Sequence, residues 1–220
     1  ITGALPAMNA WQYRVAVSGT CAPAITSNAV TLTVNERPEI TLQPVDAEIC
    51  EDDNTSFTVN AGVTTGATYQ WQVSTGGAFG NISGGLYTGE NTATLNITGA
   101  PSSWNGYRYR VIVGGTCTPN AISDTAYLTV NQKPEVTLHP IDRTICEGDN
   151  TSFTVNAGVT TNPAYQWEVD MGSGFNAVPP GPEYSGINTA TLNITGATSA
   201  MNGYPYRAVI SGTCPPDATS

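Results

Sequence analysis

The twelve residues NTSFTVNAGVTT, at Asn54–Thr65, occur again without change at Asn150–Thr161. A second block, NTATLNITGA, occupies Asn91–Ala100 and returns at Asn188–Ala197. The first pair of blocks is offset by 96 residues and the second by 97, so one residue has been inserted between them. We place this insertion in the Gly- and Pro-rich segment 171–187, because a one-residue slip within a strand would turn its apolar face outward.

Three copies of another block extend the repeat over the whole chain. ITGALPAMNAWQYRVAVSGTC begins at Ile1, ITGAPSSWNGYRYRVIVGGTC at Ile97 and ITGATSAMNGYPYRAVISGTC at Ile194. The related segments SNAVTLTV and SDTAYLTV lie further on in the first two copies. A repeat of this length in open register predicts a longer parent chain. The expected domains are the C-terminal part of a truncated repeat at 1–36, a complete repeat at 37–132, and a repeat lacking its last strand at 133–220.

Apolar residues alternate with polar ones along the complete repeat, which is the period of a half-buried β-strand. Gly, Asn, Asp and Pro separate the short segments, and no amphipathic helix interrupts them. The sequence therefore predicts an all-β fold of antiparallel two-sheet sandwiches. Trp71 and Trp167, one in each core, should be the largest buried side chains. The residues expected to face inward are Phe57, Val59, Tyr69, Trp71, Val73, Ala93, Leu95, Ile97, Tyr109, Val111, Val113, Leu128 and Val130.

The charge of the chain limits its partners. The 17 acidic and 7 basic residues give a formal net charge of −10. This sign repels nucleic acid and anionic membrane surfaces, so neither is expected as a partner. The sequence also lacks an apolar run of about 18 residues, so membrane insertion is not expected.

Three kinds of motif recur: CEDDNTSFTVNAG and CEGDNTSFTVNAG at the start of a repeat, YQW in its third strand, and GYRYRVIVGGTC near its end. Together they resemble the bacterial immunoglobulin-like domains that form long tandem arrays on surface proteins of Bacteroidetes. The resemblance spans the chain and implies tandem immunoglobulin-like antiparallel β-sandwiches. It further implies a secreted or cell-surface location, export by the type IX system, and a role like that of gliding adhesins.

The sequence departs from the antibody pattern at the inter-sheet cysteines. Val59 and Val111 stand at those two positions, so the core should be held by packing alone. Tyr109 stands two residues before Val111, where a tyrosine corner is expected. Its hydroxyl should therefore bond a backbone group upstream.

The five cysteines fall into two series. Cys50 and Cys146 precede the second strand of a repeat, whereas Cys21, Cys117 and Cys214 follow the sixth. Their regular placement favours disulfides in an oxidising compartment. No CxxC motif or Cys/His cluster suggests zinc.

Two disulfide pairings are open. The two series belong to opposite ends of an immunoglobulin sandwich, roughly 25 to 35 Å apart for strands of eight to ten residues, whereas bridged Cα atoms lie about 4.4 to 6.8 Å apart. If consecutive repeats stack head to tail, Cys50 can pair with Cys214, and the other three cysteines pair with residues beyond this sequence. A different strand order would instead allow pairs within repeats, Cys50 with Cys117 and Cys146 with Cys214.

Two clusters of acidic residues suggest that the chain binds calcium. Glu51, Asp52 and Asp53 follow the first of these cysteines, and Glu147 and Asp149 follow its counterpart. Carboxylate oxygens suit calcium, which is the one cofactor that these residues suggest. The interpretation we prefer is a solvated turn that uses Asp and Asn side chains for local hydrogen bonds. No other metal or cofactor is expected.

The remaining motifs carry little chemistry. His139 is the sole histidine, and no nucleophile motif accompanies it, so an enzyme is not expected. Thr125, within Asp124-Thr125-Ala126, matches a short O-glycosylation signal of Bacteroidetes. The N-x-S/T triplets at Asn54, Asn96, Asn150 and Asn193 are interpreted as structural. Arg207 is expected to pair with Glu168 across neighbouring strands.

These observations favour a stalk or fibre of a long extracellular filament or adhesin, which serves attachment or gliding. The expected partners are neighbouring repeats of the same chain, other copies in a filament, and surface glycans. Two alternatives remain: a carbohydrate- or surface-binding module, with Trp104, Tyr107, Tyr87 and Tyr184 stacking on sugars, or an accessory region of a secreted hydrolase.

Overall fold

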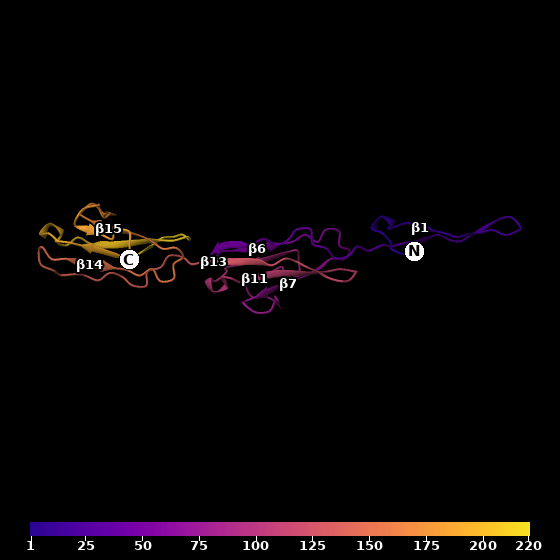
Figure 1. The fold of residues 1–220 in the computed structure, drawn as a ribbon, viewed down its shortest axis with the longest axis horizontal. Coiled ribbons are helices and arrows are strands. Elements are labelled where there is room, and N and C mark those ends of the chain that lie inside the picture. Colours follow the sequence, from indigo (N-terminus) through magenta and orange to yellow (C-terminus); the bar gives the residue numbers. More distant parts are fainter. The chain divides into compact units, whose positions relative to one another are not determined.

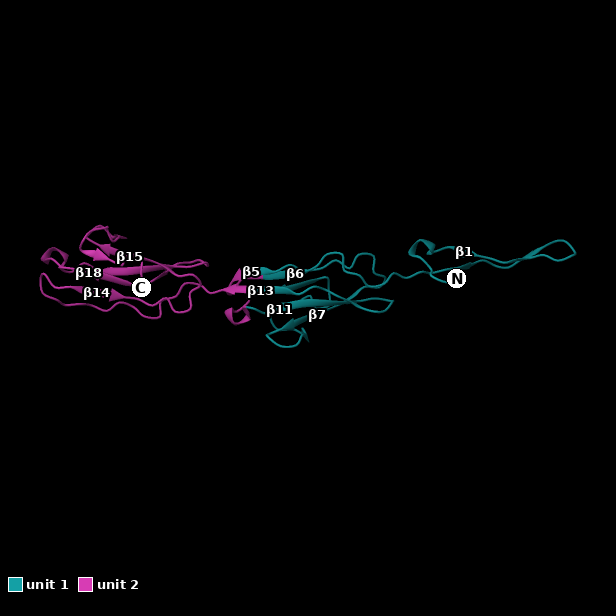
Figure 2. Ribbon diagram, in the orientation of Figure 1, with its two compact units in different colours: residues 1–47, 55–98, 106–128 teal, residues 48–54, 99–105, 129–220 magenta.

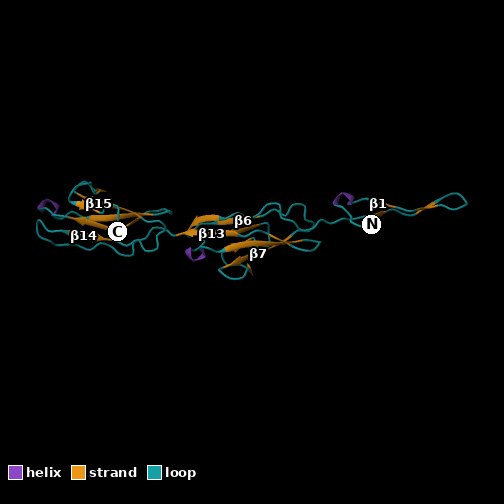
Figure 3. Cartoon of the chain, viewed as in Figure 1, coloured by secondary structure: helices purple, strands orange, loops and turns teal.

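The computed structural model describes all residues 1–220, and nearly all of its regular structure is β-strand. The strands are accompanied by three single-turn 3-10 helices, η1 (Pro6–Met8), η2 (Ser102–Trp104) and η3 (Ser199–Met201). Figure 3 colours helices and strands separately. None of these helices has the length or apolar character needed to cross a membrane. The chain divides into two compact units, which are coloured separately in Figure 2. Unit 1 comprises Ile1–Ala47, Thr55–Thr98 and Gly106–Leu128, and unit 2 comprises Glu48–Asn54, Gly99–Asn105 and Thr129–Ser220.

The N-terminal segment of unit 1 forms a long hairpin. Strand β1 (Gln12–Tyr13) pairs with β4 (Val30–Thr31), and β2 (Ala16–Val17) pairs with β3 (Ile25–Thr26). The register matches that of the complete repeat, because Tyr13 lies opposite Val30 just as Tyr109 lies opposite Ala126. The side chains are nevertheless exposed. The hairpin therefore forms from its own residues alone, whereas burial of its side chains requires the other strands of a repeat.

The middle sandwich, formed by β5 to β13, has two sheets (Figure 1). One sheet has the order β6 (Thr55–Thr58), β10 (Thr94–Ile97), β9 (Tyr87–Thr88). The other has the order β5 (Ala47–Cys50), β13 (Ala126–Asn131), β11 (Arg108–Gly114), β7 (Thr68–Ser74), β8 (Gly80–Asn81), and β12 (Ala121–Ile122) also pairs with β11. Antiparallel pairing of β7 with β11 places Trp71 opposite Val111.

The core of the middle sandwich lies between these sheets, as the alternation predicts. Trp71 is fully buried and donates its indole N–H to the carbonyl of Thr92. Val59 and Val111, at the antibody cysteine positions, are buried as well. Tyr69, Val73 and Ala93 are only partly buried, but the other predicted inward residues are buried: Phe57, Val59, Trp71, Leu95, Ile97, Tyr109, Val111, Val113, Leu128 and Val130.

The C-terminal sandwich, formed by β14 to β20, belongs wholly to unit 2. Its sheets have the orders β14 (Thr151–Thr154), β18 (Thr191–Ile194), β17 (Tyr184–Ser185) and β16 (Phe175–Ala177), β15 (Ala164–Asp170), β19 (Tyr206–Ser211), β20 (Ala218–Thr219). Trp167 is fully buried and bonds the carbonyl of Thr189. The inserted residue falls within the loops between β15 and β18, where it disturbs neither core strand.

The prediction for the Tyr109 hydroxyl is wrong. It makes its hydrogen bond with the hydroxyl of Tyr87, at 3.1 Å, and not with an upstream backbone group. Tyr206 and Tyr184 form the same pair at 3.0 Å. Phe57 stacks on Tyr109 with ring centroids 4.7 Å apart, so the tyrosine belongs to an aromatic cluster between the sheets. Burial, together with the Tyr87 hydrogen bond, raises the pKa of Tyr109 well above its ordinary value.

The predicted Arg207–Glu168 pair is confirmed, with Nε and Oε2 2.8 Å apart. In the middle sandwich Arg110 donates instead to the amide oxygen of Gln72. Each arginine also covers an aromatic ring, with Arg110 4.2 Å from the centroid of Phe79 and Arg207 4.1 Å from that of Phe175. These cation–π contacts stabilise the outer face of the larger sheet.

Candidate functional site

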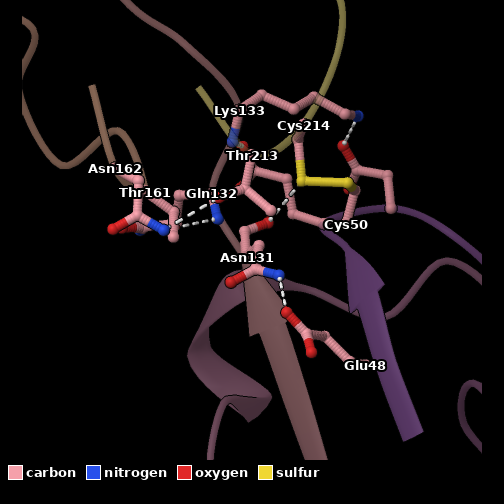
Figure 4. Close-up of a disulfide and its surroundings, with 11 residues drawn as sticks. Glu48, Cys50, Asn131, Gln132, Lys133, Thr161, Asn162, Thr213 and Cys214 are labelled. Carbon is pink, nitrogen blue, oxygen red and sulfur yellow. Dashed lines mark hydrogen bonds and ion pairs between the residues drawn. A yellow bond between two sulfur atoms is a disulfide. The ribbon is translucent and has the colours of Figure 1, made fainter. Parts of the chain in front are cut away.

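The candidate site is a disulfide between Cys50 and Cys214, both in unit 2 (Figure 4). Cys50 ends β5, and Cys214 lies in the loop after β19. Their Cα atoms are 5.7 Å apart, within the usual range for a bridge. In the sequence the two cysteines belong to consecutive repeats. The inter-repeat prediction is thus confirmed, and the alternative pairs, Cys50 with Cys117 and Cys146 with Cys214, are wrong because Cys50 and Cys214 are bonded to each other.

Asn131, the last residue of β13, organises the surroundings of the disulfide. Its carbonyl accepts a hydrogen bond from the backbone N–H of Glu51 at 2.9 Å. Its side-chain amide donates to Glu48 at 2.8 Å, and the Sγ of Cys214 lies 3.6 Å from its carbonyl oxygen. The end of β13 therefore holds the strand that carries Cys50 beside the loop that carries Cys214.

Thr161 fixes the loop of Cys214 from the other side. Its hydroxyl accepts the backbone N–H of Gln132 at 2.8 Å, and its carbonyl accepts the N–H of Thr213 at 3.0 Å. Gly212 passes so close that a Cβ there would lie 2.9 Å from the Thr161 carbonyl oxygen. A side chain at this position would push the loop away, which explains the glycine.

The same scaffold surrounds Cys117 in unit 1. Thr65 accepts from the N–H groups of Glu36 and Thr116, each at 2.9 Å, and Cys117 Sγ lies 3.6 Å from the Asn35 carbonyl oxygen. A Cβ at Gly115 would lie 3.0 Å from the Thr65 carbonyl oxygen. Cys117 nevertheless carries a free thiol, as do Cys21 and Cys146. The loop geometry is thus independent of the bond.

Charged groups add modest support to the disulfide. The backbone N–H of Lys133 donates to the Glu51 carboxylate at 2.9 Å, and Lys133 Nζ lies 3.1 Å from Asp52 Oδ2. The side chains of this ion pair are 34% and 73% exposed, so solvent screens it and it is worth about 0 to 1 kcal/mol. Positioning here depends mainly on the backbone hydrogen bonds.

The acidic clusters form turns. Asp52 has φ of 66° and its counterpart Gly148 has φ of 89°, so both lie in the left-handed region that Gly and Asp tolerate. The Asp149 carboxylate accepts the N–H of Cys146, and the Glu147 carboxylate accepts two bonds from Ser199. No group of three or more Asp, Glu, His or Cys side chains lies close enough together to hold a metal ion. The turn conformation explains why Asp52 in one repeat is replaced by Gly148 in the next, because both residue types tolerate a positive φ.

The other predicted sites lie apart from the disulfide. Thr125 is half-buried just before β13, and His139 is exposed beside Pro140. The side-chain oxygens of Asn54 and Asn150 accept the N–H groups of Gly99 and Gly196, at 2.8 and 2.9 Å. These two asparagines therefore have the structural role predicted for them.

A groove of about 690 Å³ also opens in the C-terminal sandwich. Segment 140–147 forms one wall, and Phe153, Ile194, Met201 and Tyr206 contribute to the others. In the middle sandwich β13 pairs with β11 at Tyr109, the counterpart of Tyr206. The groove follows from the absence of such a strand beside β19 among these residues.

No family model matches the chain. Over 176 residues it is 29% identical to Endoglucanase C of Cellulomonas fimi, covering 79% of this chain and 15% of that protein. The chain thus spans only a small part of the curated relative that it matches. This similarity alone leaves the family open.

Solved structures show the fold. The titin fragment I67–I69 matches with a TM-score of 0.63 and 16% identity, over 94% of this chain and 71% of that one. DIP-gamma IG1+IG2 matches with a TM-score of 0.61 and 15% identity, over 85% and 96%. Drosophila OTK extracellular domains 3–5 match with a TM-score of 0.54 and 16% identity, over 96% and 69%.

The chain is a tandem of immunoglobulin-like β-sandwiches. The disulfide therefore joins two immunoglobulin-like repeats that follow one another in the sequence. Sequence spacing located both cysteines but left their pairing open. The contacts of Asn131 and Thr161 were not predicted, although the recurrence of TT in the NAGVTT block and of Asn before each Pro linker was visible in the sequence.

Proposed function

We propose that these immunoglobulin-like repeats form the stalk or fibre of a long extracellular filament or adhesin that mediates attachment or gliding. The observation that carries this proposal is the Cys50–Cys214 disulfide, which ties consecutive repeats covalently. Disulfides persist in oxidising compartments, which supports a cell-surface location. A covalent tie between repeats suits a protein whose role is to transmit force.

The partners that we propose are other repeats of the same kind. Cys117 lies in a loop that is hydrogen-bonded in the same way as the loop of Cys214, and Cys146 corresponds in sequence to Cys50. We expect both to pair with cysteines of further repeats, so that each junction carries one disulfide. Other copies in a filament and surface glycans are further proposed contacts of the assembled fibre.

We propose a non-catalytic role for the chain. The aromatic residues that dominate each sandwich pack between its sheets, and the hydroxyls of the buried tyrosines bond one another. The polar groups around the disulfide hold backbone in place. Membership of the Bacteroidetes gliding-adhesin type, with type IX export, is part of the same proposal and rests on the sequence motifs.

An accessory region of a secreted hydrolase is the alternative, and the similarity to Endoglucanase C is what supports it. The match is partial and distant, so we do not favour it. The two functions differ in where the chain is found and what it binds. A stalk remains on the cell, whereas a carbohydrate-binding accessory region binds polysaccharide when isolated.

The test uses intact cells of the source organism. Antibodies against the 220-residue chain should label the surface of unpermeabilised cells, and deletion of repeats from the parent gene should reduce attachment or gliding while export continues. The matched control is incubation of the purified chain with cellulose and other insoluble polysaccharides. Binding to a polysaccharide together with a lack of surface labelling would overturn the stalk proposal in favour of the accessory region.

A further inference from the structure

The Cys50–Cys214 bridge closes a very long loop. The sequence separation between the two cysteines is 164 residues. The enclosed residues 51–213 include the buried tryptophans of both sandwiches, Trp71 and Trp167. Only the residues before Cys50 and after Cys214 lie outside the loop. A force that pulls on the two ends of the chain therefore stretches the residues outside the loop, whereas the disulfide spares those inside it.

We propose that the disulfide is a redox-controlled limit on the extension of the chain. Tension applied at the two ends enters at Cys50, crosses the sulfur bridge and leaves at Cys214. Once the contacts between the pulled segment and the loop have broken, residues 51–213 carry no tension, whether folded or not. The use of this limit by a cell rests on the proposed stalk function, whereas the limit itself follows from the covalent connectivity.

The size of the effect follows from chain geometry. While the bridge is intact, the Cα atoms of Cys50 and Cys214 stay 5.7 Å apart under any force that spares the bond. Once the bridge is reduced, the 164-residue separation can extend at about 3.3 to 3.6 Å per residue, or roughly 550 Å in all. Reduction thus changes a nearly fixed distance into one about a hundred times longer.

The surroundings of the bridge restrict its reduction. Cys214 is 1% exposed and Cys50 is half-buried. Reduction by an external dithiol begins when its thiolate attacks one sulfur and releases the other as a thiolate. The second thiol of the reductant then displaces the first, so that the reductant becomes a disulfide and Cys50 and Cys214 become thiols. The first attack needs access to a sulfur atom, so the intact junction shields the bond. The hydrogen bonds of Asn131 and Thr161 hold the strand and the loop that carry the two cysteines. The limit should therefore persist in mild reductant until the junction opens.

The last residues outside the loop on the N-terminal side are those that lead into β5 and along it to Cys50. Pulling from the N-terminus acts on the segment leading into β5, which is held by the Asp46 carboxylate accepting from the Tyr127 N–H and by the bridge of Leu42 with Asn60. These contacts can break, but extension stops at Cys50. The residues outside the loop number about 55 and can contribute roughly 190 Å.

Single-molecule force spectroscopy of the 220-residue chain, with handles at both ends, tests the proposal. The background carries Cys21→Ser, Cys117→Ser and Cys146→Ser, so that no free thiol can exchange with the bridge. In the oxidised protein we expect a total contour gain of about 190 Å or less. After reduction by a phosphine, the gain should rise by roughly 550 Å, with added unfolding events from the sandwiches.

Adding Cys50→Ser to this background gives the matched control, which should extend fully with or without reductant. Full extension of oxidised protein in which mass spectrometry finds the bridge intact would overturn the proposal. A limit that survives complete reduction would overturn it as well. Neither result depends on labelling or attachment of cells, so failure of the stalk function can be distinguished from failure of the extension limit.

Discussion

The middle and C-terminal sandwiches have similar cores, but the two cores differ in how far the edge strands cover them. Trp71 and Trp167 are both fully buried, and each donates its indole N–H to a threonine carbonyl. Phe57 is 1% exposed, whereas its counterpart Phe153 is only partly buried and borders the groove. The two sandwiches therefore have equivalent centres and different edges.

The difference comes from two strands, because β13 and β5 extend the larger sheet of the middle sandwich and neither has a strand as its counterpart in the C-terminal sandwich. In the middle sandwich β13 pairs with β11 and buries Ala126, Leu128 and Val130. In the C-terminal sandwich β19 pairs with β15 and β20, and no strand covers the side next to Phe153 and Tyr206. Both sandwiches thus form around the strands that carry the tryptophan and the two paired tyrosines. The last strand, β13 in the middle sandwich, covers the edge of its core.

Truncation of the central tryptophans should have the largest effect, and it should be equal in both sandwiches. Trp71→Ala and Trp167→Ala should each lower the free energy of unfolding of their own sandwich by about 3 to 5 kcal/mol, because each leaves a cavity at a fully buried position. Hydrogen exchange in β7 and β15 measures the two sandwiches separately. A clearly smaller loss for Trp167→Ala would mean that the groove reaches the centre of the core.

Truncation of the phenylalanines should separate the two sandwiches. Phe57→Ala should cost about 3 to 5 kcal/mol, as for a fully buried ring. Phe153→Ala should cost less than about 3 kcal/mol, because this ring already borders the groove and loses less burial. Denaturant unfolding followed by hydrogen exchange in β6 and β14 gives both values. Equal losses would contradict the account of the unsealed edge.

Periodicity predicted most of this fold because strand alternation and burial follow the same period of two. Phe57, Trp71, Leu95 and Val111 are buried where the pattern places them. The Tyr109 hydroxyl was assigned the wrong partner because Tyr87 lies in a short strand that alternation does not mark. Phe79 and Phe175 were missed as partners of the arginines, since they lie in or beside turns.

The disulfide shows the limit of prediction from sequence. Spacing located both series of cysteines, yet the choice between pairings depended on the fold of the loops around Asn131 and Thr161. Those loops are set by hydrogen bonds between residues far apart in the sequence. The calcium and glycosylation hypotheses remain predictions, although the structure explains the acidic turns without a metal.

Alkaline pH should destabilise both sandwiches, through the buried Tyr109 in one and the partly buried Tyr206 in the other. Burial raises the pKa of Tyr109 and of Tyr206 above the unfolded value of about 10. The native state therefore holds the proton more tightly, so this contribution is complete below pH 10 and is lost as the pH rises further. By pH 11 Tyr109 should cost roughly 1 kcal/mol, and the more exposed Tyr206 should cost less.

Single substitutions show which tyrosine causes the loss of stability at alkaline pH. Tyr109→Phe should reduce the loss between pH 9 and 11 in the middle sandwich and leave the C-terminal sandwich unchanged, and Tyr206→Phe should do the reverse. Hydrogen exchange corrected for its intrinsic pH dependence measures both. A pH dependence that neither substitution alters would refute the assignment to these hydroxyls.

The smallest expected effect concerns the outer faces. Glu168→Gln gives the C-terminal sandwich the Arg–Gln pair of the middle one. The Arg207–Glu168 side chains are 37% and 20% exposed, so the loss should be about 0.2 to 1 kcal/mol and should shrink in high salt. Thermal unfolding at low and high salt measures it. A loss that is independent of salt would mean that packing on Phe175 dominates.

The disulfide pairing can be measured directly by peptide mapping without reduction. Cleavage after glutamate places each of the five cysteines in a different peptide. We predict that Ile49–Glu51 is linked to the peptide carrying Cys214, and that the peptides of Cys21, Cys117 and Cys146 in this 220-residue chain are unlinked. A link from Ile49–Glu51 to the peptide carrying Cys117 would contradict the joining of consecutive repeats.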